Sequence, residues 1–296
     1  MLLNEQQIGS KAMTVHEILS ESTKALESAE IPSARLDAEV LLAFYLKCNR
    51  LEFLKNPEMT LNEKQIAGYR ELVTRRLRWE PIAYITGRKA FWTFSLEVNK
   101  NVLIPRPDTE IIVEETLDIC RKVDAVEINI LDIGTGSGAI ALALAKEIDN
   151  AHVVATDISA AALALARQNA RSLKLDDKME FHQGDLFAPV EEVFDIVVCN
   201  PPYIPEDEYK ELPAGVKDYE PRIALLAGEN GLEFYKKLVY QGPRYLKKNG
   251  WLLLEIGAKQ NDTVRGLMEE TGWYDSIVMR RDYAGLPRVV RARRKK

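Results

Sequence analysis

The residues best suited to chemistry are Asn200-Pro201-Pro202-Tyr203, which directly follow the apolar run Phe194–Cys199. Two consecutive prolines cannot donate hydrogen bonds to a sheet, so the strand predicted for the apolar run must end here. The turn therefore presents an Asn side chain, backbone carbonyls and an aromatic ring at the carboxyl end of a strand, where open α/β sheets bind ligands. These acceptors suit a planar amide or amino group with N–H donors. An ordinary surface turn would use the same residue types.

A glycine-rich loop is a second candidate binding element. It follows the predicted strand Ile128–Ile133 and opens a helix. Glycines allow a tight turn and let the backbone approach a ligand closely. The same spacing satisfies the fingerprint of dinucleotide-binding proteins, so the loop alone leaves the ligand open. The loop residues expected to bind a cofactor are Gly134, Thr135, Gly136, Ser137 and Gly138.

Acidic residues at the ends of three predicted strands narrow the choice of ligand. Asp157 can accept both ribose hydroxyls of an adenosine, and Asp185 is placed to meet the adenine amino group, with Leu186 against the adenine face. Asp132, two residues before the loop, would repel a pyrophosphate and favours a cationic ligand. S-adenosylmethionine carries a sulfonium and an ammonium group and no phosphate. The alternative is that Asp132 only caps amides of the loop.

Two regions with different periodicity must position these residues. Residues 14–80 repeat apolar side chains at helical spacing only, so residues 1–81 are predicted to form a small helical bundle without strands, a substrate-recognition domain. Residues 82–105 are aromatic and β-branched around turn-forming residues, which predicts a β-hairpin linker. Residues 106–296 then form the predicted catalytic domain.

Strands and helices alternate in the catalytic domain, which predicts a doubly wound α/β fold with a seven-stranded, mostly parallel sheet. No helix separates the last two strands, so one of them is expected to run antiparallel. The basic stretch Arg288–Lys296 is interpreted as the last strand continuing into a solvated tail, and the alternative is that it attracts an RNA-bound or acidic partner. The predicted strands are Ile128–Ile133, His152–Asp157, Met179–Gln183, Phe194–Asn200, Trp251–Ile256, Tyr274–Arg281 and Arg288–Arg293. The predicted helices are Gly138–Ile148, Ser159–Leu173, Gly231–Leu246 and Lys259–Thr271.

Composition excludes several other classes of protein. The net charge of −5 argues against nucleic acid as the main substrate, because duplex-binding domains are usually basic. The three cysteines form no Cys-x-x-Cys pair and the three histidines lack metal-ligand spacing, so no metal site is predicted. No apolar run approaches the roughly 18 residues of a membrane span, and the N-terminus has no signal pattern. We therefore expect a cytoplasmic protein without a membrane partner.

Together these motifs resemble the class I S-adenosylmethionine methyltransferases that act on planar nitrogen. More narrowly, the chain is similar to the release-factor glutamine methyltransferases, the PrmC/HemK family, over roughly residues 14–295. Further matches are Pro105–Glu110, Tyr219–Arg222 and the preceding helical region. Position 186 departs from some members, which carry Trp beside the adenine where this chain has Leu. Either side chain can pack on a purine.

The resemblance implies a reaction and a partner. S-adenosylmethionine would donate a methyl group to the N5 amide of the Gln in the Gly-Gly-Gln loop of peptide chain release factors, with the enzyme acting as a monomer. Asn200, Pro201, Pro202 and Tyr203 would be catalytic and substrate-binding, and Asn200 would also touch the cofactor. Arg106 and Glu110 are assigned to the substrate side, near the methionine end of the cofactor.

Three alternatives remain open at this point. An N6-adenine DNA or RNA methyltransferase must grip an amine of the same donor geometry, after base flipping. A ribosomal-protein glutamine methyltransferase would use the same chemistry on another protein. A non-catalytic module could bind the cofactor or a nicotinamide dinucleotide, although Asp132 and the complete Asn200–Tyr203 turn argue against it.

Overall fold

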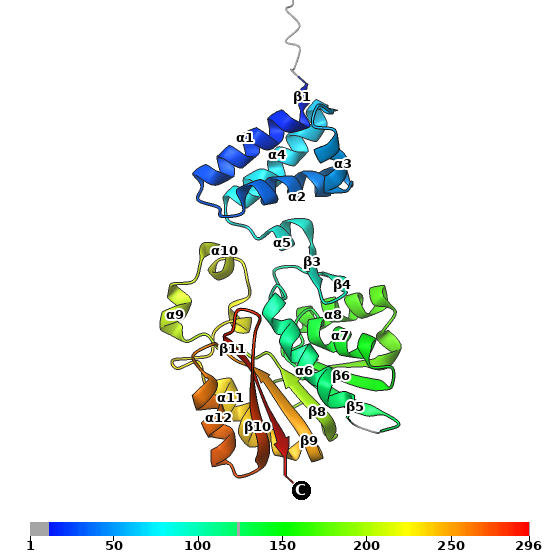
Figure 1. Cartoon of the computed structure of the whole chain (residues 1–296), viewed down its shortest axis with the longest axis vertical. Helices are drawn as coiled ribbons and strands as arrows, with labels where there is room; N and C mark the ends of the chain where they lie inside the picture. The colour runs from blue at the N-terminus through cyan, green and yellow to red at the C-terminus, as the bar shows by residue number, and fades with distance from the viewer. Residues whose placement is uncertain (1–11, 123–124, 296) are drawn as a thin grey trace, which may run out of the picture. The chain divides into compact units, whose positions relative to one another are not determined.

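The chain folds into two compact units, Met1–Thr86 and Gly87–Lys296, in a computed structural model that describes residues 12–122 and 125–295 (Figure 1). Each unit has its own hydrophobic core. Among the described residues, no helix is long and apolar enough to cross a lipid bilayer.

The first unit is built from helices that bury one face each. Its elements are α1 (Val15–Ser28), α2 (Ala34–Leu46), α3 (Arg50–Lys55), α4 (Glu63–Leu77) and α5 (Ile82–Thr86). Two of the helices begin with a capping box, in which Thr14 pairs with Glu17 and Asn62 with Gln65, so the first amides of α1 and α4 have acceptors. The core side chains include Ile18, Leu26, Leu41, Leu42 and Tyr69.

Two details of this unit differ from the sequence prediction. It contains a short strand pair, β1 (Met13–Thr14) with β2 (Thr60–Leu61), because the extended residues before two helix starts lie side by side. Residues 82–86 form α5 and not a strand. Pro81 accepts the first turn's hydrogen bonds from Tyr84 and Ile85, and Ala83 and Ile85 are buried. Packing and a helix-starting proline therefore override β-branched propensity.

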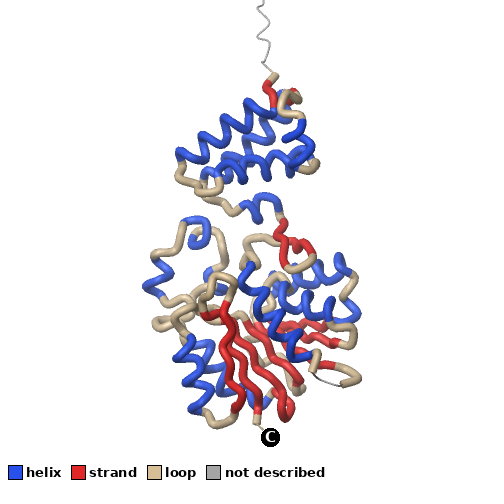
Figure 2. Tube along the Cα trace, in the orientation of Figure 1, coloured by secondary structure: helices blue, strands red, loops and turns tan. Residues whose placement is uncertain are grey.

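The second unit opens with a hairpin shorter than predicted, β3 (Arg88–Phe91) with β4 (Phe94–Glu97). Its central sheet has seven strands in the order β10-β11-β9-β8-β5-β6-β7 (Figure 2). Strands β5 to β9 run parallel, and β11 is antiparallel to both neighbours, as the missing helix before it predicted. The strands are β5 (Ile128–Ile133), β6 (Ala151–Asp157), β7 (Met179–Gln183), β8 (Phe194–Cys199), β9 (Leu246–Glu255), β10 (Tyr274–Arg281) and β11 (Pro287–Arg294).

Helices cover both faces of this sheet (Figure 1). One face packs against α6 (Glu110–Cys120), α7 (Ala139–Glu147) and α8 (Ala160–Leu173), and the other against α11 (Glu233–Gln241) and α12 (Asn261–Glu270). This arrangement confirms the Rossmann-like class predicted from the alternation of strands and helices. The remaining helices are short: α9 (Glu206–Lys210), α10 (Ala214–Lys217) and 3₁₀ turns at Pro107–Thr109, Asp176–Lys178, Arg222–Ala224 and Gly242–Arg244.

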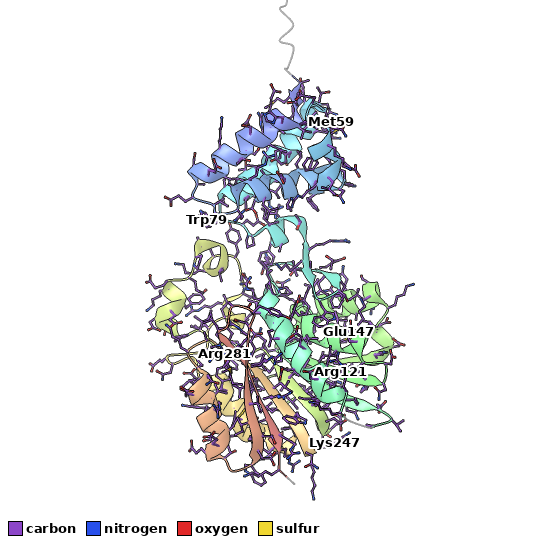
Figure 3. All side chains as sticks on the ribbon, viewed as in Figure 1. Met59, Trp79, Arg121, Glu147, Lys247 and Arg281 are labelled. Atoms are coloured by element: carbon purple, nitrogen blue, oxygen red, sulfur yellow. The ribbon has the colours of Figure 1, made fainter. Side chains whose placement is uncertain are left out.

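Two predicted boundaries are wrong. Helix α11 ends at Gln241 and not at Leu246, because Gly242-Pro243 follows, and β9 consequently begins at Leu246. Lys247 in this early part of β9 (labelled in Figure 3) donates to Asp195 Oδ2 at 2.8 Å and ties β9 to β8.

The basic C-terminal stretch is also more structured than predicted. The predicted strand is confirmed as β11, which lies between β9 and β10 and extends one residue further, to Arg294; its arginines form ion pairs. Arg288 pairs with Asp282, Arg291 with Glu115, and Arg293 with Asp275. Nearby acidic residues thus neutralise these positive charges of β11, the strand next to the edge strand β10.

Candidate active site

One cavity, of about 260 Å³, opens at the carboxyl ends of β5, β6 and β8. Strands β6 and β7 follow β5 on one side, and β8 and β9 lie on its other side. The position between β5 and β8 is therefore the topological switch point, where doubly wound sheets bind ligands. Most of the predicted site residues line it. They are Arg106, Gly134, Thr135, Gly136, Ser137, Asp157, Asp185, Leu186, Asn200, Pro201 and Pro202.

The glycine loop forms the floor of the cavity. Gly136 has a φ of +57°, a conformation that strains residues with a Cβ, and its amide donates to Asp157 Oδ2 at 2.9 Å. Gly138, which caps α7 with a φ of +85°, does not line the cavity. A Cβ there would lie 2.9 Å from Leu142, so this glycine serves packing of the loop against its helix.

Asp157 is oriented by the backbone. Its Oδ2 accepts from Gly136 and its Oδ1 accepts from the Ser159 amide at 2.8 Å. Burial raises the pKa of the carboxyl group, and the amides of Ser159, Gly136 and Ile158 lower it. A carboxylate held in this way keeps lone pairs directed at the cavity and can accept hydrogen bonds from a diol.

Asp132 lies beneath the loop and does not line the cavity. Its residue is 1% exposed, and its Oδ2 accepts from Thr135 Oγ1 at 2.7 Å. Burial raises its pKa to about 7, against the lowering effect of the Thr135 hydroxyl and the Ala141 amide, and Asp157 raises it further. Asp132 therefore braces the loop through Thr135 and can influence a ligand only by its charge.

The Asn200 side chain is held through its NH₂ group by a neighbouring polar side chain. Its Nδ2 donates to Thr109 Oγ1 at 3.3 Å, and the side chains of Asn200 and Thr109 both lower the pKa of the buried carboxyl group of Glu255, at the end of β9. These contacts use the NH₂ end of the amide, so Oδ1 is the end that remains for the cavity. The turn then offers Asn200 Oδ1 and the carbonyls of two prolines, which have no backbone N–H.

Glu255 is a buried acid that sequence reasoning missed. The residue is 1% exposed, and burial raises its pKa to about 7, while Thr109, Arg288 and Asn200 lower it and Asp108 raises it. The signal was present in the sequence as a single acidic residue at the carboxyl end of the apolar run Trp251–Ile256. Burial of a carboxyl group lowers the stability of the fold unless the group is paired. An acidic residue at such a position is therefore a candidate for a role in the site.

Besides Gly138 and Asp132, two more predicted residues lie outside the cavity. The Tyr203 ring packs against the core beneath α11 and α12, and burial raises the pKa of its hydroxyl to about 12. The Glu110 carboxylate accepts from the Trp92 amide at 2.9 Å and thereby caps the turn of the β3–β4 hairpin. Arg106 does line the cavity, where it forms an ion pair with the buried Glu220, which also accepts from the Ile104 amide.

The cavity has further lining residues that the sequence did not single out. Phe234 and Lys237 reach it from α11, and Lys237 lies 3.7 Å from the Asp185 carboxylate. Ile158 and Ile223, both about half exposed, lie at its rim. Apolar side chains beside an acidic residue suit a heteroaromatic ring with an exocyclic amine.

A Rossmann-like sheet with this glycine loop, an acid after the second strand and an Asn-Pro-Pro-Tyr turn after the fourth defines a methyltransferase. Family models agree: residues 17–87 match the PrmC N-terminal domain and residues 115–212 match the methyltransferase small domain. The release factor glutamine methyltransferase of Rhodopirellula baltica is 40% identical over 94% of this chain and 95% of its own length, and that of Coxiella burnetii is 43% identical over 88% and 92%. The chain belongs to the release factor glutamine methyltransferase family.

A solved structure supports the fold alone. A methyltransferase from Pyrococcus furiosus aligns with a TM-score of 0.51 at 21% identity, over 75% of this chain and 98% of that chain. At this level of identity the similarity carries the architecture of the catalytic unit and no statement about substrate.

Proposed function

We propose that this enzyme transfers the methyl group of S-adenosylmethionine to the side-chain amide nitrogen of the glutamine in the Gly-Gly-Gln loop of peptide chain release factors. The observation that carries the proposal is that the glycine loop, Asp157 and the Asn200–Pro202 turn line one cavity. A methyl donor bound at the glycine loop and a planar nitrogen bound at the turn would then lie in the same cavity, on the same edge of the sheet. The family named for this activity supplies the identity of the acceptor.

The residues of the cavity fit the donor. Asp157 would accept the ribose hydroxyls and Asp185 the adenine amino group, with Leu186 and Phe234 against the ring. The lining cations Arg106 and Lys237 are each paired with an acid, so they do not form a free phosphate site. When bound, S-adenosylmethionine supplies an electrophilic methyl group on a sulfonium.

The turn acts on the acceptor by orientation. A glutamine amide nitrogen is a poor nucleophile because its lone pair is delocalised into the carbonyl, and no side chain in the cavity could fully deprotonate it. Asn200 Oδ1 and the Pro201 carbonyl would each accept one N–H, which fixes the nitrogen in the cavity. An N–H buried without an acceptor costs about 1–3 kcal/mol, so the two acceptors also select an NH₂ group. Exclusion of water and a fixed approach then supply most of the rate increase.

The test incubates the enzyme with methyl-labelled S-adenosylmethionine and one acceptor at a time. A release factor should take up label, and its Gly-Gly-Gln variant with Gln replaced by Ala should not. Adenine-containing DNA and RNA, and ribosomal proteins, should remain unlabelled. Label on the Gln→Ala factor or on nucleic acid would refute the proposal, and label confined to a ribosomal protein would move the same chemistry to a different partner.

The remaining assignments follow from this function. We assign substrate recognition to the helical unit within residues 1–81 and catalysis to residues 106–296, with 82–105 as the connection. Release factors act in translation, so the reaction would take place in the cytoplasm. Light scattering on the purified protein should give a mass near 33.5 kDa if the enzyme is a monomer, and a mass of twice this value would contradict that assignment.

A further inference from the structure

Gln260, between β9 and α12, is the centre of a hydrogen-bond network behind the Asn200–Tyr203 turn. Its Nε2 donates to the carbonyls of Tyr203 at 3.0 Å and Gly231 at 3.1 Å. Its Oε1 accepts from the Gly257 amide at 2.9 Å, and it shares the single proton of the Tyr235 hydroxyl, 3.2 Å away, with the Glu255 carbonyl oxygen at 3.0 Å. A glutamine amide has two N–H donors and two acceptor lone pairs, so both donors and one lone pair are fully used and the second lone pair shares a donor.

The backbone around Gln260 is shaped to allow these contacts. At Gly231, which has a φ of +69°, a Cβ would lie 2.5 Å from the Tyr203 carbonyl oxygen and 2.9 Å from Gln260 Nε2. At Gly257 a Cβ would lie 2.8 Å from Gln260 Oε1. Two glycines thus let the turn, the segment before α11 and the end of β9 converge on one amide, with no room for a larger residue at either place.

The composition of the turn makes such an anchor necessary. Pro201 and Pro202 have no backbone N–H, so two of the four residues of the turn cannot donate a hydrogen bond that would hold it in place. The Tyr203 carbonyl is the point where the end of the turn is held by a side chain from another element. Because proline φ angles are fixed, a shift at Tyr203 would be transmitted to the Pro201 carbonyl.

We propose that Gln260 is a positioning residue of this enzyme: by holding Tyr203 it fixes the Pro201 carbonyl and Asn200 Oδ1 where they orient the acceptor amide. The inference rests on the proposed function for its chemistry. Gln260 does not line the cavity, so it acts through the turn and not on the cofactor. Misplacement of a reacting group by about 1 Å can cost on the order of 10²-fold in rate.

The experiment compares Gln260→Met, which keeps length and volume but removes the side-chain hydrogen bonds, with Gln260→Glu, which keeps the acceptor oxygen and sets a carboxylate oxygen against the Tyr203 and Gly231 carbonyls. Thermal unfolding of each variant shows whether it is folded. Tyr274→Phe is the matched control. It removes a buried hydrogen bond, from the Tyr274 hydroxyl to the Val239 carbonyl at 2.9 Å, in the core that also contains Tyr235. Turnover on a release factor, S-adenosylmethionine affinity by calorimetry, and backbone hydrogen exchange after the turn are measured for each protein.

We expect kcat to fall 10- to 100-fold in both Gln260 variants, with cofactor affinity within threefold of wild type and kcat of Tyr274→Phe within twofold. Exchange at Ile204, whose amide donates to Leu225, should accelerate in the Gln260 variants only. Unchanged kcat, a parallel loss of cofactor affinity, or unchanged exchange would overturn the proposal. If the wild type methylates no release factor, the proposed function fails, and hydrogen exchange still decides whether Gln260 holds the turn.

Discussion

Replacement of Asp132 by asparagine should change how the stability of the catalytic unit depends on pH. The pKa of this buried carboxyl group is raised by burial from 3.8 to about 7. A folded-state pKa above the unfolded value means that the folded protein holds the proton more tightly. The contribution of Asp132 to stability is therefore fully present below about pH 4 and is progressively lost as the pH rises to about 7.

The magnitude follows from the size of the shift. One pKa unit corresponds to 1.36 kcal/mol, so the rise from pH 5 to pH 7, at which the folded carboxyl group is itself half ionised, should remove about 2 kcal/mol of stability through this one group. Asparagine has nearly the same shape and can accept from Thr135 Oγ1, but it carries no charge. Relative to the wild type, Asp132→Asn should thus gain about 2 kcal/mol in free energy of unfolding from pH 5 to pH 7, whatever its stability at pH 5.

Urea unfolding at several pH values can measure this difference. Tryptophan fluorescence reports the catalytic unit through Trp92, Trp251 and Trp273 once Trp79, in the first unit, is replaced by Phe in both proteins. The same change at the exposed Asp177 is the control and should leave the pH dependence unaltered. If Asp132→Asn and wild type lose stability in parallel between pH 5 and pH 7, Asp132 titrates normally and the argument from burial is refuted.

Four other changes test the rest of the site. Asn200→Ala should lower kcat by about 10²- to 10³-fold, as loss of one preorganised polar contact does, while calorimetry shows retained cofactor binding; unchanged turnover would remove Asn200 from the reaction. Wild-type kcat should rise with pH through about 7 as Glu255 ionises and its negative charge attracts the Asn200 NH₂ more strongly, and Glu255→Gln should flatten this rise in a pH–rate profile. Gly136→Ala should cost about 1–2 kcal/mol in urea unfolding because its φ is +57°, and equal stability would contradict the strain. Deletion of residues 291–296 should abolish cooperative unfolding in circular dichroism, because Ala292 is buried in β11, whereas a merely solvated tail could be removed without effect.

Much of the catalytic unit was accessible from sequence because its signals are local. A strand buried on both faces appears as an apolar run, and a glycine loop or a double proline after such a run marks its carboxyl end. Since parallel strands share that edge, the Asn200 turn, Asp157 and the glycine loop could be predicted to meet. Residues 82–86 carry no such local signal. Their side chains favour a strand, and packing in the first unit together with the helix start at Pro81 makes them helical.

The supporting residues were beyond sequence reasoning for a different reason. Gln260 lies 57 residues from Tyr203 along the chain, and Glu255 reaches Asn200 and Thr109 from another strand. Such contacts depend on which strands are neighbours, and local periodicity does not encode strand order. Likewise Asp132 was expected to act on a ligand, but burial under the loop is a property of the assembled sheet end.

The way the turn is supported explains why an Asn-Pro-Pro sequence suits a primary amide. Pro201 and Pro202 contribute carbonyls without N–H groups, so they cannot repel the N–H donors of an incoming amide. The NH₂ of Asn200, the remaining side-chain donor, is drawn away by Thr109 and Glu255. The turn thus offers the cavity a set of acceptors and no competing donor of its own. A substrate that offers a lone pair in place of an N–H would leave these acceptors unpaired, at about 1–3 kcal/mol each, so selection for an NH₂ group follows from the turn and from the two residues that hold Asn200.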